Sequence, residues 1–203
     1  MKKLYIFDFD GTLVNTFYDS VISYNQALKE HNLPEYEYES LDQIDYTDFV
    51  DNMTDNMTVL ETYSKIYENS EKEHTLPYNG ITTVLEELIN QKKELAICSN
   101  RKQEQLMEYT EKLFPEINFS HIIGYTPNGA FKPNPEVMNS ILDNVEYSKD
   151  EIVYVGDKKT DIVTAQNVNV DAVIVTWGQG DKEAYTDKYP LKIIDKAEEL
   201  LKI

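Results

Sequence analysis

Two aspartates separated by one residue follow a short apolar run near the start of the chain, in the sequence Asp8-Phe9-Asp10-Gly11-Thr12. Side chains two apart in a strand point the same way, so Asp8 and Asp10 can face one site while Phe9 packs into the core. The alternative is a strand end whose acids are merely solvated. Two acids directly after a buried strand, followed by Gly-Thr, favour a functional site.

A second acidic pair occurs in Gly156-Asp157-Lys158-Lys159-Thr160-Asp161. Either Asp157 or Asp161 could be a helix cap. Together with Asp8, however, they supply hard oxygen ligands, which suit Mg²⁺ better than a soft metal. The three histidines lack metal-ligand spacing, and no Cys/His cluster offers a zinc site.

Two further polar segments could bind an anion. Ser99 and Asn100 end an apolar run, and they could cap the next helix or hold phosphate oxygens with free backbone donors. Arg101, the only arginine of the chain, has a donor fork suited to phosphate or carboxylate, although a single arginine among lysines is also unremarkable. Lys132 lies in a Pro-x-Pro frame before a predicted helix, where a fixed ammonium could neutralise a transferring phosphoryl group.

The elements that position these residues are short apolar strands alternating with amphipathic helices. The expected strands cover residues 4–7, 94–98, 121–123, 152–155 and 172–175, and the expected helices include 135–142 and 160–167. This alternation predicts an α/β fold, a Rossmann-like three-layer parallel sheet. Ligands bind at the carboxyl ends of such strands, so the four polar segments should converge on one crevice.

Residues 15–78 have a different character. They hold fourteen Asp/Glu and three Lys, a net charge of −11, and eight of the fifteen tyrosines. Apolar residues recur at helical spacing, and Ser40-Leu41-Asp42-Gln43 fits a capping box that would open a further helix. We therefore predict a small helical domain at 15–78, inserted into an α/β core formed by 1–14 and 79–203, with no strand in the insert.

Composition limits the partners. The net charge of −18 disfavours nucleic acid and anionic membranes, while one metal ion or lysine can still bind a small phosphate. The single cysteine, Cys98, excludes an internal disulfide, and the apolar start is interrupted by Asp8 before a signal core can form. We expect a cytoplasmic protein, a monomer or homodimer, that acts on a small phosphorylated metabolite.

The four polar segments, in this order, resemble the signature motifs of the haloacid dehalogenase superfamily. The insert after the first motif resembles its type 1 cap, and the segments at 77–80 and 175–178 look like the phosphoglycolate phosphatase-like branch. The resemblance spans nearly the whole core and is weak in the cap. One departure is Lys158, where this branch usually has a small hydroxyl residue; it could face solvent or add charge near the phosphate.

The resemblance implies a Mg²⁺-dependent phosphatase that works through an aspartyl-phosphate on Asp8, with Asp10 as general acid and base. Mg²⁺ would be held by Asp8, the carbonyl of Asp10 and Asp157, with Asp161 in its first or second coordination shell. Gly11, Ser99, Asn100 and Lys132 would bind the phosphoryl oxygens, and Arg101 could contact the substrate.

Three other functions fit the same motifs to different degrees. A β-phosphoglucomutase-like mutase or an inorganic pyrophosphatase would use the same residues, whereas a phosphoryl-accepting switch would not need the acid at Asp10 or the cap. The acidic insert leads us to expect a neutral or cationic leaving group. Arg101 or a lysine of the insert could instead bind an anionic leaving group. The acids could also lie on an outer helix face that never contacts substrate.

Overall fold

The computed structural model describes residues 1–180 and 182–203 and divides the chain into two compact units. The core unit comprises Met1–Val14 and Pro77–Ile203, and the insert unit comprises Asn15–Leu76. The insert begins at the expected residue and ends two residues before the expected boundary at 78. Within the described residues, no helix is both long and apolar enough to cross a membrane.

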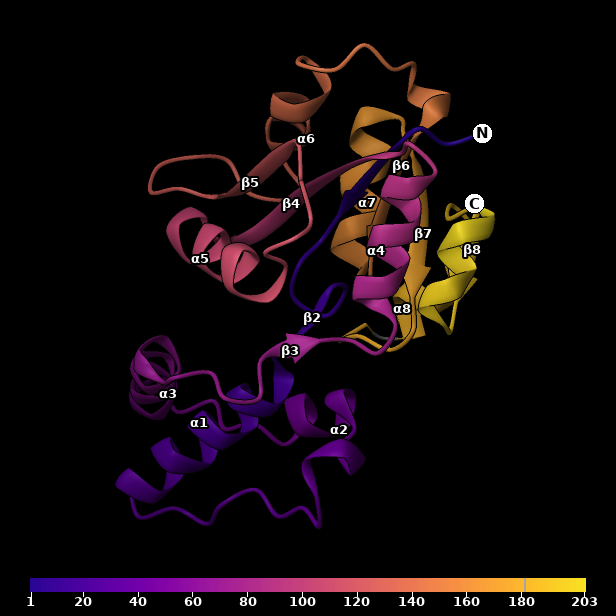
Figure 1. Ribbon diagram of the computed structural model, residues 1–203. Coiled ribbons are helices and arrows are strands. Elements are labelled where there is room, and N and C mark those ends of the chain that lie inside the picture. The colour runs from indigo at the N-terminus through magenta and orange to yellow at the C-terminus, as the bar shows by residue number, and fades with distance from the viewer. Residues whose placement is uncertain (181) are drawn as a thin grey trace. The chain divides into compact units, whose positions relative to one another are not determined.

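The core unit contains a six-stranded parallel sheet in the order β5-β4-β1-β6-β7-β8 (Figure 1). Its strands are β1 (Leu4–Phe7), β4 (Glu94–Lys102), β5 (His121–Tyr125), β6 (Ile152–Gly156), β7 (Asp171–Val175) and β8 (Lys192–Ile194). Five lie where the apolar runs predict them. The edge strand β8 is not expected from the sequence, because its three residues give too short a run.

Helices cover both faces of this sheet, which confirms the predicted α/β class. They are α4 (Ile81–Asn90), α5 (Gln103–Leu113), α6 (Pro135–Leu142), α7 (Lys159–Val168) and α8 (Lys182–Tyr185), with the 3-10 turns η2 (Lys149–Glu151) and η3 (Ala197–Lys202). Strand residues alternate between two apolar clusters: Tyr5 and Phe7 pack with α4, α5 and η3, while Leu4 and Ile6 pack with α6 and α7. The alternation follows from the two-residue period of a strand, and it produces the three layers.

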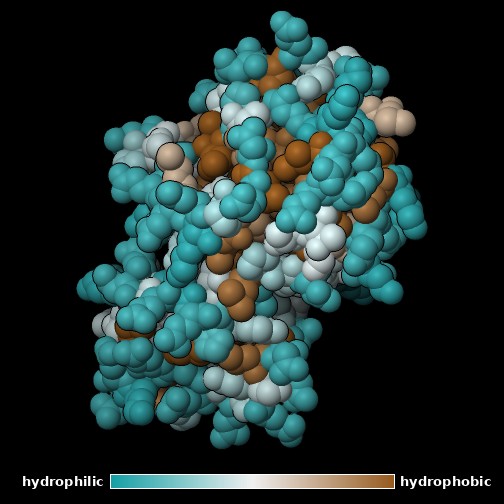
Figure 2. Space-filling view, viewed as in Figure 1, coloured by the Kyte–Doolittle hydropathy of each residue, from teal (hydrophilic) through white to brown (hydrophobic). Residues whose placement is uncertain are grey.

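The insert unit is formed by α1 (Phe17–Glu30), η1 (Leu41–Gln43), α2 (Tyr46–Asp51) and α3 (Met57–Asn69). Its core explains the excess of aromatic residues: Phe49 has edge-to-face contacts with Phe17, Tyr24 and Tyr36 at centroid distances of 5.4, 5.4 and 5.1 Å. Such pairs add stabilisation beyond the area they bury. Polar residues cover most of the molecular face in Figure 2, as the high charge predicts.

Two details of the insert differ from expectation. The predicted capping box at Ser40 is wrong: Ser40 forms no side-chain cap, and Ile44 turns extended after three 3-10 residues. The helix begins instead after Asp45, whose carboxylate accepts a hydrogen bond from the Asp48 amide. In addition, the two-residue strands β2 (Val14–Asn15) and β3 (Leu76–Pro77), where the chain passes between the units, form a two-stranded sheet.

Candidate active site

The carboxyl ends of β1 and β6 bring the predicted acids together. One carboxylate oxygen from each of Asp8, Asp157 and Asp161 lies within 4.8 Å of the other two, and all three residues are buried. Asp8 follows β1 directly, Asp157 follows β6, and Asp161 lies in the first turn of α7. Parallel neighbours end at the same sheet edge, so the α/β topology alone accounts for the meeting of these residues.

The ammonium of Lys132 lies among these acids. Its Nζ is 2.8 Å from Asp8 Oδ1, and it donates to Asp161 Oδ1 at 2.7 Å and to the Tyr154 hydroxyl at 2.9 Å. Burial opposes the lysine charge, but attraction to Asp161 and Asp8 outweighs burial and raises the pKa of Lys132 above its ordinary value. The lysine therefore stays charged inside the site.

The positive charge of Lys132 is not enough to stabilise the ionised forms of the buried carboxylates. Burial raises the pKa of Asp8 to about 6 even though Lys132 opposes the shift. Burial, together with repulsion from Asp161 and Asp8, raises the pKa of Asp157 well above its ordinary value. A bound cation removes this penalty, because it stabilises the charged form of each acid.

A magnesium ion fits the donor set. Asp157 Oδ1 is buried and has no hydrogen-bond partner among the described residues, whereas Asp157 Oδ2 accepts from the Gln179 amide at 2.6 Å. Buried polar atoms without a partner are rare and call for an explanation. A hard cation held by Asp157 Oδ1 and Asp8 provides one.

Asp161 is committed to hydrogen bonds with the protein. Its Oδ1 accepts from Lys132, and its Oδ2 accepts from the backbone amides of Asp157 and Lys158 at 3.1 and 3.0 Å. It thereby ties α7 to the loop that carries Asp157. These contacts favour a positioning role over direct metal ligation.

Glycines allow the close approach of the loops around Asp157. Gly11 has φ +83°, and a Cβ at this position would overlap Asp157 Oδ2. A Cβ at Gly178 would overlap the Gly11 carbonyl and lie 2.7 Å from both Cβ and Oδ2 of Asp157. The Gly11 amide donates to the Val14 carbonyl at 2.9 Å and so shapes the turn; the phosphate contact predicted for Gly11 stays a prediction.

The side chains of Ser99 and Asn100, in β4, form hydrogen bonds with neighbouring backbone groups. The Asn100 side chain pairs with the backbone of Lys132 in both directions, accepting from its amide at 2.7 Å and donating to its carbonyl at 3.1 Å. Ser99 is buried, and its Oγ accepts from the Arg101 amide at 3.3 Å. Asn100 therefore holds the backbone of Lys132, and its predicted contact with phosphate stays a prediction.

Arg101 lies against Asp10. Its Nε donates to Asp10 Oδ2 at 2.9 Å and its Nη2 donates to Asp10 Oδ1 at 2.6 Å, while the guanidinium lies over the Tyr109 ring at 5.0 Å. The Arg101 side chain is 6 % exposed and that of Asp10 is 26 % exposed. The donors of the Arg101 guanidinium are thus engaged by Asp10, and the Asp10 carboxylate keeps partial access to solvent.

Two site residues were missed by sequence reasoning. Tyr154, read as a core residue of β6, contacts Lys132 with its hydroxyl. Gln179 binds Asp157 through its amide, and its side chain accepts from Lys158 Nζ at 3.2 Å. Lys158 therefore contacts the loop after β7, and its charge opposes the rise in the pKa of Asp157. A polar hydroxyl in an otherwise aliphatic strand, three residues before Asp157, is a signal for Tyr154; Gln179 carries none.

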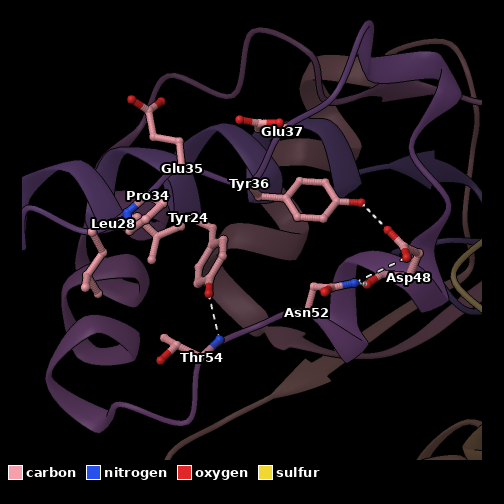
Figure 3. Close-up of a pocket in the computed structure, with 10 residues that line it drawn as sticks. Tyr24, Leu28, Pro34, Glu35, Tyr36, Glu37, Asp48, Asn52 and Thr54 are labelled. Carbon is pink, nitrogen blue, oxygen red and sulfur yellow. Dashed lines mark hydrogen bonds between the residues drawn. The ribbon is translucent and has the colours of Figure 1, made fainter.

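The insert unit has a surface pocket of about 550 Å³ (Figure 3). Glu35, Glu37 and Asp48 are among its lining residues, and the lining contains no lysine or arginine. The Tyr36 hydroxyl donates to Asp48 at 2.6 Å. An anion would therefore be repelled from this pocket.

A parallel α/β sheet whose strand ends gather a carboxylate cluster, one buried lysine and an acid held by arginine is typical of an enzyme active site. The chain belongs to the haloacid dehalogenase-like hydrolases, whose family model matches residues 5–175.

Comparison with individual proteins agrees with this assignment. The chain is 27 % identical to phosphoglycolate phosphatase of Mannheimia succiniciproducens, covering 99 % of this chain and 97 % of the relative. It is also 27 % identical to pyrophosphatase PpaX of Oceanobacillus iheyensis, with coverage of 98 and 94 %. A solved haloacid dehalogenase-like protein from Streptococcus pneumoniae has the same fold, with a TM-score of 0.80 at 20 % identity over 99 and 97 % of the two chains.

Proposed function

We propose that the protein is a Mg²⁺-dependent phosphatase that hydrolyses a small phosphomonoester through an aspartyl-phosphate on Asp8. The observation that carries the proposal is the placement of Asp8. It is a buried carboxylate at the end of the central strand, 2.8 Å from the Lys132 ammonium and clustered with Asp157. A carboxylate nucleophile needs such compensation, because it must approach a phosphate dianion.

The chain's residues divide the reaction between them. An Asp8 oxygen forms a bond to phosphorus as the ester P–O bond breaks, and Asp10 gives its proton to the departing alkoxide. Asp10 then takes a proton from water, which attacks phosphorus; the P–O bond to Asp8 breaks, leaving free Asp8 and inorganic phosphate. Lys132 balances charge on the transferring group. Mg²⁺, held by Asp8, Asp157 and the Asp10 carbonyl, would offset the repulsion between nucleophile and substrate.

The leaving group we propose is neutral or cationic. The only arginine of the chain is occupied by Asp10, and a carboxylate on the leaving group needs a cationic partner. In the insert unit, Lys72 is buried, and its ammonium contacts Ser70 and the Tyr67 ring. We further propose that the protein acts in the cytoplasm as a monomer or homodimer, without a nucleic-acid or membrane partner.

A phosphate-release screen with Mg²⁺ or with EDTA tests the function. Sugar phosphates, nucleotides, phosphoglycolate and pyrophosphate are compared, and sugar products are checked for isomerisation. We expect Mg²⁺-dependent release from a monoester, abolished in Asp8→Asn and retained in Asp143→Asn, which changes an exposed carboxylate of the core unit. Activity retained in Asp8→Asn overturns the nucleophile assignment, and a clear preference for phosphoglycolate overturns the leaving-group proposal.

Inorganic pyrophosphate is the second candidate substrate, because one of the relatives is a pyrophosphatase. Its leaving group is itself an anion, and the pairing of Arg101 with Asp10 disfavours the binding of such a group. Faster release of inorganic phosphate from pyrophosphate than from every monoester in the same screen would support this alternative.

A further inference from the structure

Tyr154 lies in the middle of β6, and its hydroxyl lies beside Lys132 and Asp161. The side chain is fully buried, and it packs on the face of the sheet that is covered by α6 and α7. Buried tyrosines usually find a partner for the hydroxyl, so burial alone assigns no role. What distinguishes Tyr154 is the identity of its partners.

The Tyr154 hydroxyl connects three segments that carry site residues. It donates to the backbone carbonyl of Cys98 in β4 at 2.8 Å and accepts from Lys132 Nζ at 2.9 Å. It also lies 3.2 Å from Asp161 Oδ1. The hydroxyl has one proton, and the shorter contact assigns that proton to Cys98. Its oxygen lone pairs are then directed at the ammonium.

The three protons of the Lys132 ammonium have three acceptors, namely Asp8 Oδ1, Asp161 Oδ1 and the Tyr154 hydroxyl. Asp161 and Tyr154 belong to the scaffold, whereas Asp8 is the proposed nucleophile. Because Asp161 and Tyr154 each accept one N–H of the ammonium, and the lysine side chain fixes its position, the third N–H can point only toward Asp8. Because the hydroxyl is neutral, it sets this direction without neutralising the lysine charge.

We propose that Tyr154 is a positioning residue that orients the Lys132 ammonium toward Asp8 and the phosphoryl group bound there. This inference rests on the proposed phosphatase function. Without the hydroxyl, the ammonium keeps its charge and its contact with Asp161 but loses one of its two anchors. The loss should affect the transition state more than substrate binding, because charge balance at the transferring group depends on placement.

The test compares Tyr154→Phe with Tyr5→Phe. Tyr5 is a matched control: it is a buried tyrosine on the neighbouring strand β1, it packs on the opposite face of the sheet, and its hydroxyl donates to the Ile203 carbonyl at 3.3 Å. We expect Tyr154→Phe to lower kcat roughly tenfold, the loss typical of one hydrogen bond to a charged group, with little change in KM. Tyr5→Phe should keep the kcat of the wild type.

A second variant and a double-mutant cycle distinguish a positioning role of Tyr154 from a general effect of its mutation on folding. Tyr154→Met removes the same hydroxyl but fills space adaptably, so it should show the same kcat loss even where Tyr154→Phe folds poorly. In a Lys132→Met background, Tyr154→Phe should cost less than about twofold further, because its effect acts through the lysine.

The possible outcomes are distinguishable. A wild-type kcat in both Tyr154 variants, an equal loss in Tyr5→Phe, or a full additional loss in the Lys132→Met background overturns the role of Tyr154 while leaving the phosphatase proposal intact. A wild-type protein that hydrolyses no phosphate ester overturns the proposed function, and the role of Tyr154 with it.

Discussion

Arg101 holds the carboxylate of Asp10 with two donors, Nε and Nη2, at 2.9 and 2.6 Å. A bidentate pair fixes both the position and the plane of a carboxylate, which a single ammonium cannot do. The chain's only arginine is therefore used to orient the proposed general acid and base.

The first prediction concerns Arg101→Met. General acid catalysis contributes about 10²–10⁴ to the rate, so a poorly oriented Asp10 should slow hydrolysis of alkyl phosphates by at least about tenfold. An aryl phosphate with a good leaving group needs little protonation and should be much less affected. Steady-state kinetics on the two substrates give the ratio, and Arg101→Lys should recover only part of the loss. Equal losses on both substrates would instead assign Arg101 to phosphate binding.

The second prediction concerns the metal. A ligand that binds only the folded state stabilises it by about 2.7 kcal/mol at a hundredfold excess over Kd, so Mg²⁺ should raise the melting temperature. Asp157→Asn should abolish that increase, because Asp157 Oδ1 is a buried carboxylate oxygen without a protein partner among the described residues. Asp143→Asn should keep it. A normal Mg²⁺ response in Asp157→Asn would refute the assigned ligand.

The third prediction concerns pH in the metal-free protein. The pKa of Asp8 is raised from 3.8 to about 6, so between these values the folded state keeps a proton that the unfolded state releases. The contribution of Asp8 therefore makes the protein less stable as pH rises through this window, by about 3 kcal/mol in total for a two-unit shift.

Asp8→Asn isolates this contribution. Urea unfolding in EDTA from pH 4 to 7 should show the variant gaining stability relative to the wild type as pH rises. Parallel curves for the two proteins would contradict the raised pKa of Asp8.

The fourth prediction concerns Gly178→Ala. The new methyl would overlap the Gly11 carbonyl and press on Asp157, and overpacking of this kind costs about 1–3 kcal/mol. We expect lower stability in urea and a weaker Mg²⁺ response. Gly129→Ala is the control, since its Cβ would meet mainly the movable Thr126 side chain in an exposed segment. A Gly178→Ala protein that matches this control would show that the loops can separate without cost.

The meeting of Asp8 with Asp157 could be predicted because it follows from the topology. Each acid ends a buried strand, and parallel strands deliver their ends to one edge. The same reasoning located Lys132 near the site through its loop. These relations depend on the order and direction of elements, which apolar periodicity reveals.

The partners of individual side chains could not be predicted. Asn100 contacts the backbone of Lys132, and Arg101 contacts Asp10, because of loop conformations that no periodic pattern encodes. Ser40 has the residues of a capping box, but Ile44 turns extended and Asp45 supplies the cap. Local signals compete with the tertiary environment, and the environment decides between neighbouring candidates.

Trp177 is the only tryptophan of the chain, and its indole Nε1 donates to the Thr12 carbonyl in the first motif at 3.1 Å. The insert unit has aromatic residues of its own but no tryptophan. Selective tryptophan fluorescence therefore reports on the loop beside the nucleophile without a tryptophan signal from the insert, whereas the tyrosines are divided between the two units. The sequence thus supplies a built-in optical probe for following the core unit during unfolding or ligand binding.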